Sequence, residues 1–480
     1  MNPPFHHSMT VPSLALSGPC TAARVVIVAA IAAVLGACST PPAYSPPSVA
    51  VPGAFKEAPA TWIPATPADA LDRGPWWEMF GDEELNRLAA QVQLSNQNIA
   101  AAVAAYSQAQ AVVRQGQAGL LPGVRLSGGA SRFGGAGASR QGNSAQATLA
   151  ADWEPDFWGR LAGSVSSAQA SAQASEADLA SARLSAAGAL ASAYFQLREA
   201  DAELALLDAT VQGYERNLQI ARNRYAAGVV AETDVLQART QLVNAQAERV
   251  SVGQNRARLE HALAVLTGQA PAGFAVAAVA SWSASVPAVP AVVPSALLQR
   301  RPDIASAERA VAAADAQVGV QQSAYFPSIN LGASLGTGGS SLADVLRAST
   351  SVWSLGLSVA QTLFDAGATA ARVQQAQAAR EARVARYRQT VLEAFQGVED
   401  QLAALRALQD QEPLRREAVA AAERAAQQQL NRYRAGQVGY SEVVAAQASA
   451  LAAQRALLQW RVNRQLATVA LVQALGGGWH

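Results

Sequence analysis

Charged residues are scarce in this sequence, and the two signs almost balance. Only 15% of the 480 residues are charged, the formal net charge is +1, and Lys56 is the single lysine. A chain without an excess of positive charge has no general electrostatic attraction for nucleic acid. Low charge combined with 50% hydrophobic residues also argues against a largely disordered chain. The sequence therefore predicts a folded protein that does not bind nucleic acid.

Cysteine and histidine are also rare, and this excludes most kinds of catalytic or metal site. Two cysteines can form at most one disulfide bond, so the chain is not a disulfide scaffold. Two of the four histidines, His6 and His7, lie near the N-terminus, which leaves His261 and His480 elsewhere. Histidine is the usual acid–base group near neutral pH and a common metal ligand. We therefore expect no enzyme, no metal site and no cofactor.

A short apolar run near the N-terminus has the features of an export signal. Residues 25–37 are apolar and follow Arg24. The run is shorter than the ~20 residues that a membrane-spanning helix needs, which is typical of a signal peptide. It ends in Leu-Gly-Ala-Cys-Ser at 35–39, which resembles the lipobox of bacterial lipoproteins. The resemblance implies a lipoprotein signal peptide at 1–37 and acylation of Cys38; the alternative is a secretory signal that is cut nearby.

Acylation of Cys38 would attach the mature chain to a membrane. Each buried methylene contributes about 0.8 kcal/mol, so several acyl chains hold a protein stably where one chain does not. Ser39, rather than aspartate, follows the cysteine, and among bacterial lipoproteins this implies sorting to the outer membrane. Residues 38–75 are rich in proline, alanine and small polar residues, which favours an extended conformation. We expect a lipid-anchored tether over this range.

Several short motifs occur twice at a nearly constant spacing. Two Arg-Tyr-x-x-Gly motifs end at Gly228 and Gly436, and 436 − 228 = 208. Leu-Pro-Gly-Val at 121–124 corresponds to Phe-Pro-Ser-Ile at 326–329, and 326 − 121 = 205. Such a period is too long for a solenoid, so it predicts two similar halves. The expected division is a first repeat, a proline-rich linker and a second repeat, at 76–268, 269–299 and 300–476.

Each half contains a long stretch in which apolar residues are spaced three and four apart. This heptad spacing is typical of helices that coil around each other, and the intervening alanine, glutamine and arginine favour helix. In the first half it predicts a helix from about Gly159 to Ala227, on the order of 100 Å long at about 1.5 Å per residue. Alone, the pattern also fits an ordinary helical bundle or a fibrous coiled coil. The heptad positions are Leu204, Leu207, Val211, Tyr214, Leu218, Ala221 and Tyr225, and Val384, Tyr387, Val391, Phe395, Val398, Leu402 and Leu405.

Four other segments alternate apolar and small polar residues with a period of two, which indicates strands with one apolar face. Their lengths fit tilted strands of about 9–11 residues that cross a bilayer. The polar face carries serine, glycine, asparagine and glutamine rather than charges, which favours membrane strands over a soluble sheet. Glycine- and serine-rich turns at 134–144 and 337–350 would join the strands in pairs. The predicted strands are about 124–133, 145–154, 328–336 and 352–362.

Four strands in a membrane cannot close a barrel by themselves. Lipid offers no hydrogen-bond partners, so every backbone N–H and C=O must be paired within a closed sheet. Single-chain barrels begin at about eight strands. Several copies of this chain must therefore contribute, and three copies would supply twelve strands. The small residues of the polar face would leave such a barrel open.

Taken together, the motifs resemble those of the outer membrane factors, the TolC-like outlets, and most of all their lipoprotein branch of NodT and OprM type. The resemblance covers residues ~38–476. The segments that carry it are Trp-Trp-Glu-Met-Phe at 76–80, Asp-Trp-Glu-Pro-Asp-Phe-Trp-Gly at 152–159, Arg-Arg-Pro-Asp-Ile at 300–304, Phe-Pro-Ser-Ile at 326–329 and Leu-Phe-Asp-Ala-Gly at 363–367.

This resemblance implies an internally duplicated α+β membrane protein. Its long helices would form an α-barrel in the periplasm, and its four strands would contribute to a trimeric 12-stranded β-barrel in the bacterial outer membrane. The homotrimer would be a passive duct of a tripartite efflux system for drugs or toxic compounds. Its partners would be outer membrane lipid, a periplasmic adaptor and an inner-membrane pump of the resistance–nodulation–division (RND) class. The alternatives are the outlet of a type I protein secretion system and a structural coiled-coil lipoprotein.

The two Arg-Tyr-x-x-Gly motifs are expected to be hairpin turns at the periplasmic tip. Glycine is favoured just after a helix, where a left-handed backbone is needed. Thr233 and Ser441 are expected to cap the following helices. The resemblance implies that Tyr225, Gly228, Tyr433 and Gly436 dock the adaptor; packing between helices is the alternative for the tyrosines.

Acidic residues follow both turns. By resemblance, Asp234 and Glu442 lie at the periplasmic gate, where rings of carboxylates would repel one another and favour cations. The alternative is a structural role, because an acid in the first turn of a helix is stabilised by the helix dipole. Arg224 and Arg432 are expected to pair with these acids across neighbouring helices.

Overall fold

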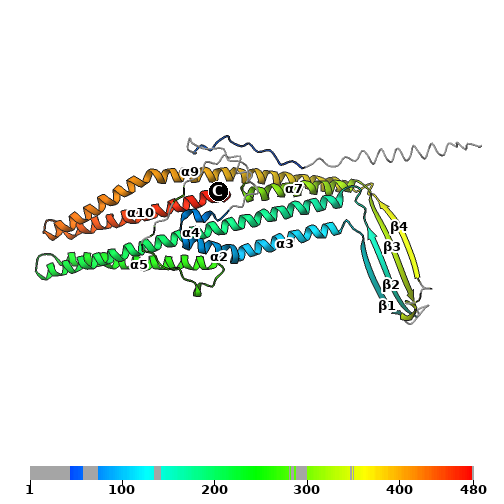
Figure 1. Ribbon diagram of the computed structural model, residues 1–480, viewed down its shortest axis with the longest axis horizontal. Helices are drawn as coiled ribbons and strands as arrows, with labels where there is room; N and C mark the ends of the chain where they lie inside the picture. The colour runs from blue at the N-terminus through cyan, green and yellow to red at the C-terminus, as the bar shows by residue number, and fades with distance from the viewer. Residues whose placement is uncertain are drawn as a thin grey trace, which may run out of the picture.

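The structure is a computed structural model, and it describes residues 44–57, 74–134, 142–280, 282, 286–287, 300–345, 347, 349 and 351–477. The described part is a long bundle of helices with a small β-sheet at one end (Figure 1). The predicted signal peptide at 1–37 and Cys38 lie outside the described residues. None of the helices in the described ranges has an apolar stretch that would span a bilayer.

The helices repeat in length as well as in motif. Helices α4 and α9 both contain 67 residues, and α5 and α10 both contain 35. At about 1.5 Å per residue, the two longest are roughly 100 Å long. The predicted duplication and the predicted long helix are confirmed. The main helices are α2 (Glu83–Ser95), α3 (Gln97–Ala118), α4 (Arg160–Ala226), α5 (Glu232–Leu266), α7 (Pro302–Gln322), α9 (Ala368–Arg434) and α10 (Tyr440–Ala474). The short ones are η1 (Trp76–Phe80), η2 (Pro271–Gly273), η3 (Ser323–Tyr325) and α8 (Leu342–Val345).

Four strands form one antiparallel sheet in chain order. They are β1 (Gly123–Phe133), β2 (Gly142–Trp153), β3 (Ser328–Gly339) and β4 (Ser351–Ala360). All four predicted strands are present. Strands β2 and β3 continue into the expected turns at 134–144 and 337–350, and the second turn also contains α8. Pairing of β2 with β3 joins the two halves of the chain into a single sheet.

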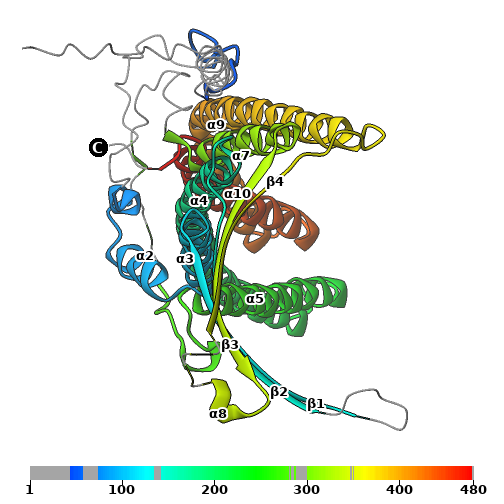
Figure 2. The same cartoon turned by 90° about the vertical axis from the view of Figure 1, so that its right-hand side faces the viewer.

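The register places apolar residues on one face of the sheet. Leu126 lies opposite Leu149, which lies opposite Leu335, which lies opposite Trp353. Directly opposed residues point to the same face, so this row crosses all four strands. The next residue on each strand points to the other face, where Ser127, Thr148, Ser334 and Ser354 lie. Seen along the bundle, the sheet is curved rather than flat (Figure 2).

Proline and glycine residues set the junctions between the sheet and the helices. Pro122 and Pro327 stand just before β1 and β3, after the preceding helices have ended. Proline cannot continue the helical hydrogen-bond ladder. On the return path, α4 and α9 begin after Gly159 and Gly367, whose φ angles are +72° and +90°. This left-handed conformation is easily adopted only by glycine, and it turns the chain from strand into helix.

Aromatic residues pack where the sheet meets the helices. The rings of Trp158 and Phe326 are stacked with centroids 4.9 Å apart, and the Trp158 indole N–H donates to the carbonyl of Pro327 at 2.6 Å. The indole N–H of Trp153 donates to the carbonyl of Leu120 at 3.0 Å. Phe364, by contrast, is 88% exposed. Amphipathic aromatic side chains at this level are typical of a membrane–water interface.

Below the sheet, the helices follow the order of the strands. Each neighbouring pair in the series α3, α4, α7 and α9 is in contact, and each of these helices leads into or out of the strand above it. Most of the predicted heptad positions are buried, including Tyr214 and Leu218 in α4 and Val391 and Val398 in α9. Tyr225, at the end of the first series, is 47% exposed.

A buried ionic network fixes the start of the linker against the middle of the bundle. Asp201 accepts hydrogen bonds from Arg198 at 3.0 Å and from Arg256 at 2.6 Å. The same arginines donate to the carbonyls of Ala277 and Val276, both at 2.7 Å. The Asp201 side chain is only 1% exposed, so these partners are needed to stabilise its charge.

Candidate functional site

The tips of the two helical hairpins have the same backbone geometry. Gly228, with a φ of +72°, donates its N–H to the carbonyl of Tyr225 at 2.9 Å, and the next N–H donates to the carbonyl of Arg224 at 2.9 Å. The second turn repeats both bonds around Gly436, whose φ is +75°. This pair of bonds defines a Schellman motif, which satisfies carbonyls at the end of a helix. Both glycines are therefore required by the turn itself.

The predicted helix caps are wrong by two positions. Helix α5 begins at Glu232 after Ala231, and neither Ala231 nor Gly439, which precedes α10, provides a capping side chain. Thr233 and Ser441 are consequently the second residues of their helices. The helices begin earlier than expected because the extended residue before each one accepts the first backbone hydrogen bond without a side-chain cap. Its carbonyl accepts from the backbone N–H of Asp234 at 3.1 Å in the first turn and of Glu442 at 3.3 Å in the second.

Asp234 and Glu442 thus occupy equivalent positions in the first turn of α5 and α10. Asp234 is half-buried and Glu442 is exposed. A third acid, Glu232, opens α5 and is also exposed. Sequence reasoning missed Glu232, although an acid beside Asp234 in the first turn was the available signal. All three carboxylates lie where the positive end of a helix dipole stabilises them.

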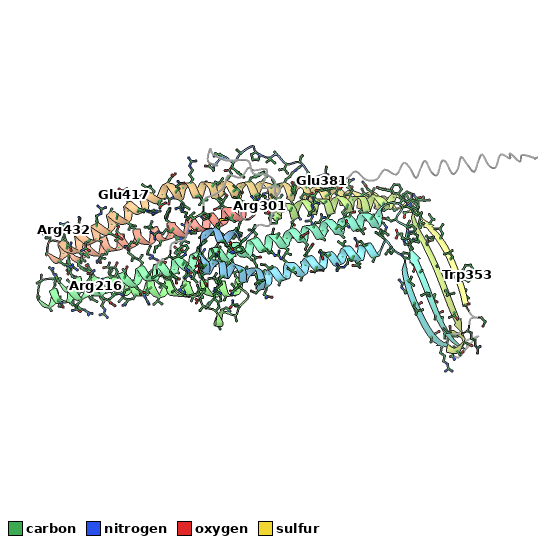
Figure 3. All side chains as sticks on the ribbon, viewed as in Figure 1. Arg216, Arg301, Trp353, Glu381, Glu417 and Arg432 are labelled. Carbon is green, nitrogen blue, oxygen red and sulfur yellow. The ribbon has the colours of Figure 1, made fainter. Side chains whose placement is uncertain are left out.

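Arg224 does not pair with these acids, which corrects the expectation. Its guanidinium donates to the carbonyls of Tyr433 and Arg434, both at 2.8 Å, and its central carbon lies 4.9 Å from the centre of the Tyr433 ring. The last carbonyls of a helix carry partial negative charge and attract a cation. Arg224 therefore connects the end of α4 to the end of α9. Arg432, its counterpart in the second repeat, is exposed at the far end of the bundle (Figure 3) and pairs with neither acid.

The two tyrosines of the motifs have different environments. Tyr225 is 47% exposed, whereas Tyr433 is 1% exposed and packs against Tyr440 with ring centroids 5.1 Å apart. Burial, and then the nearby charge of Asp234, raise the pKa of the Tyr433 hydroxyl to about 12. Tyr433 therefore follows the packing alternative, and its side chain is not available to a docking partner in this chain.

A second connection between the hairpins lies further from the tips. The Arg455 guanidinium on α10 donates to Glu203 of α4 at 2.6 Å and to Glu248 of α5 at 2.7 Å. Helix α9 also contains Pro413, which removes a backbone donor and bends a helix. Figure 1 shows α9 changing direction in this part of its course. Both features break the repeat, and sequence reasoning did not consider them.

The opposite end of the molecule has two open sheet edges. In the described chain, β1 and β4 each pair on one side only, and every residue of both strands is exposed. The exposed residues include large apolar side chains: Leu126 is 76% exposed, Trp353 is 77% and Leu355 is 75%. Folded proteins generally avoid a long, apolar, unpaired strand at the edge of a sheet, because it pairs readily with a strand of another chain.

Comparisons with known proteins agree with this arrangement. The family described as "Outer membrane efflux protein" matches residues 88–269 and 293–477, one segment in each repeat. The chain belongs to the outer membrane efflux protein family. The expected family, fold class, efflux function and outer-membrane location are thereby confirmed. Within the described residues, no cluster of histidine, cysteine and acidic side chains is suited to hold a metal ion.

Individual relatives match this chain over almost its full length. It is 33% identical to the pyoverdine export outer membrane protein OpmQ of Pseudomonas aeruginosa, over 93% of this chain and 95% of that protein. It is 30% identical to the probable efflux pump outer membrane protein TtgC of Pseudomonas putida, over 94% and 95%. The solved outer-membrane channel OprN superposes with a TM-score of 0.81 at 30% identity, over 92% of this chain and 99% of that one.

Proposed function

We propose that three copies of this chain form a passive outer-membrane duct that exports small molecules. An inner-membrane pump of the RND class supplies the energy, a periplasmic adaptor connects the pump to the duct, and the chain itself catalyses no reaction. The observation that carries the proposal is the four-stranded sheet, with an apolar face and two unpaired edges. Similarity to OpmQ and TtgC, named for pyoverdine export and for efflux, favours small molecules over secreted proteins.

The barrel closes by pairing β4 of one copy with β1 of the next. Unpaired backbone groups in hydrocarbon cost several kcal/mol each, so a sheet with two open edges is unstable in lipid. Pairing around three copies leaves no edge. The apolar face then contacts lipid, and the opposite face, which carries Ser127, Thr148 and Ser334, lines the water-filled interior. The helices α3, α4, α7 and α9 continue the four strands into the periplasm in the same order.

The periplasmic gate lies at the tips of the helices. Asp234 and Glu442 occur once in each copy, so a trimer brings three of each together around its axis. Rings of like charges in a narrow opening raise the local concentration of cations and repel anions. Glu232 adds a third acid to the same end of the molecule. The connection from Arg224 to the end of α9 holds the two hairpins of each copy together when the gate is closed.

The adaptor docks on the exposed parts of the tips. Tyr225, Gly228 and Gly436 are all exposed, so they remain the candidate contacts. Tyr433 is a positioning residue instead, because its buried ring supports Arg224. Changing Tyr225 to alanine should weaken adaptor co-purification while trimer yield stays the same. Equal loss of both would assign Tyr225 to folding instead.

Cys38 anchors the mature chain through acyl groups, and residues 38–75 form the tether. The Cys38→Ala variant should incorporate no radiolabelled palmitate and should accumulate as an uncleaved precursor. Undiminished labelling would refute the lipidation site.

The function is tested by reconstitution. Purified protein should run as a trimer in mild detergent and should produce steady conductance in planar bilayers. In a host that lacks its own outlets, it should restore export of a fluorescent substrate only when adaptor and pump are present. A monomer that leaves bilayers intact would support the coiled-coil alternative, whereas export of a protein but of no small molecule would support a type I secretion outlet.

A further inference from the structure

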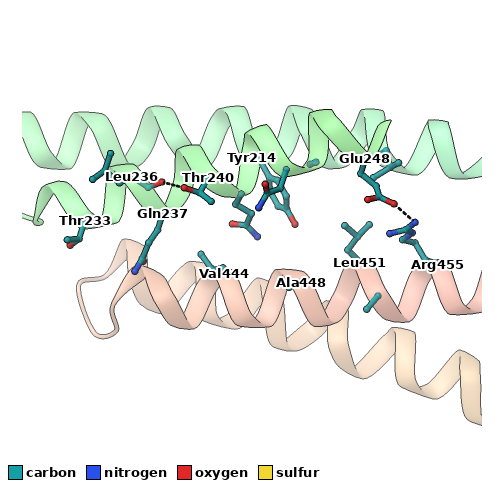
Figure 4. A pocket seen from close by; sticks show the side chains of 15 residues that line it. Tyr214, Thr233, Leu236, Gln237, Thr240, Glu248, Val444, Ala448, Leu451 and Arg455 are labelled. Atoms are coloured by element: carbon teal, nitrogen blue, oxygen red, sulfur yellow. Dashed lines mark hydrogen bonds and ion pairs between the residues drawn. The ribbon is translucent and has the colours of Figure 1, made fainter. Parts of the chain in front are cut away.

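An open cavity of about 660 Å³ lies between the two hairpins. Helices α5 and α10 form its walls, and α4 forms its floor (Figure 4). Its volume falls within the range of about 300–1,000 Å³ that is usual for small-molecule sites. The residues that matter most are Leu207 and Tyr214 on α4, Leu236 and Glu248 on α5, and Leu451 and Arg455 on α10.

The floor of the cavity is apolar and aromatic. Leu207 is fully buried and Tyr214 is 6% exposed, so both side chains are fixed by packing. Leu236, which is 54% exposed, offers further apolar surface at the rim. Half-buried Leu451 adds apolar surface from the opposite wall. Apolar walls above a rigid floor suit a hydrocarbon or aromatic body, because little side-chain freedom in the floor is lost on binding.

One end of the cavity carries an excess of negative charge. Arg455 is bound by two carboxylates, Glu203 and Glu248, so this ionic cluster has a net charge of −1. The Glu248 side chain is 45% exposed, which leaves it accessible to a ligand in the cavity. Figure 4 shows its bond to Arg455 at this end, with Leu451 beside it. An occupant with a positive group is therefore complementary to the site, and an anion is not.

The duplication of the chain provides an internal comparison. In the second repeat, 208 residues later, the positions of Leu207, Tyr214 and Glu248 are occupied by Arg415, Ala422 and Ala456. A groove built from these residues lacks both the ring and the carboxylate, and it carries an additional positive charge. The cation-binding features consequently occur once per chain and not once per repeat.

We propose that this cavity binds one amphipathic organic cation per chain, with its apolar body between Leu236 and Leu451 above Tyr214 and its cationic group beside Glu248. The walls belong to different hairpins, so an occupant holds α5 and α10 at a fixed spacing. Binding itself does not depend on the proposed function. Its consequence, a change in the opening of the tips, rests on the proposed gate.

Binding is tested with rhodamine 6G, a fluorescent monovalent amphipathic cation, and the full-length trimer in lipid nanodiscs. Fluorescence anisotropy should show saturable binding of one dye per chain after subtraction of empty nanodiscs. Glu248→Gln removes the charge and Ala448→Trp fills the cavity, and each should weaken binding by about tenfold or more. Glu417→Gln on α9, outside the cavity, is the matched control and should bind like the unchanged protein. Gel filtration confirms that each variant remains assembled.

Three results would overturn the proposal. The first is no saturable binding to the trimer, as expected if a neighbouring copy fills the groove. The second is equal binding by both cavity variants and the control. The third is equally strong binding of fluorescein, an anion of similar size. Planar-bilayer recordings test separately whether binding changes the opening of the tips. Binding of the dye without any change in conductance would support the site and refute its link to the gate.

Discussion

A charge placed on the lipid-facing side of the sheet should prevent assembly. Leu355 is 75% exposed in the single chain and lies in register with Ala333, which lies in register with Ala151 and then Val124. Leu355 and Ala333 lie in the middle of β4 and β3, and arginine in the middle of the lipid face of a barrel costs about 2–4 kcal/mol. For each copy, this cost corresponds to a roughly 30- to 700-fold shift toward the unassembled state.

The neighbouring residue provides the control. Ser354 points to the opposite face and pairs with Ser334, so in a closed barrel Ser354→Arg places the same charge in water. Heat-sensitive trimer bands on gels, together with outer-membrane yield, measure assembly of both variants. Leu355→Arg should abolish the trimer and Ser354→Arg should retain it. Equal loss in both variants, or the opposite order, would show that the assignment of the two faces is wrong.

Three further predictions concern the helices. Arg224→Ala removes two charge-assisted bonds, worth about 2 kcal/mol together, and should raise basal conductance, whereas the exposed Arg432→Ala should not; identical recordings would contradict the connection between the hairpins. Asp234→Asn combined with Glu442→Gln should reduce cation selectivity in salt-gradient reversal potentials, and unchanged selectivity would reject the acidic rings. Burial, and then Glu203, raise the pKa of Glu199 to about 7, so its ionisation opposes folding and stability falls as pH rises from about 4.5 through 7. Glu199→Gln should flatten the dependence of thermal stability on pH over this window; a curve that keeps its slope would contradict that origin.

The elements were predictable because they depend on local pattern. A period of two gave the strands to within about three residues, and Gly159 and Gly367 gave the starts of the long helices. The cavity and the ionic network were not predictable. Arg455 reaches carboxylates on two other helices, and Arg224 binds backbone carbonyls of the other repeat, contacts that only the folded arrangement determines.

The tips of the hairpins also combine features that the sequence predicts with features that it does not. Both turns were predictable, because Gly228 and Gly436 mark helix ends where a left-handed backbone is required. Tyr225 and Tyr433 occupy the same position in the two motifs, yet one is exposed and the other is buried. Their difference comes from neighbouring Tyr440 and Arg224 and not from the motif itself. Equivalent sequence positions in a duplicated chain therefore need not have equivalent roles.

Direct detection of β4 of one copy beside β1 of the next is the sharpest test of the account. If Cys38 is acylated, the mature chain has no free cysteine, so one cysteine introduced into each of these strands can be cross-linked without background. Oxidation in intact outer membranes should yield covalent dimers and trimers on non-reducing gels. Chains that remain monomeric at every paired position would contradict closure of the barrel by three copies.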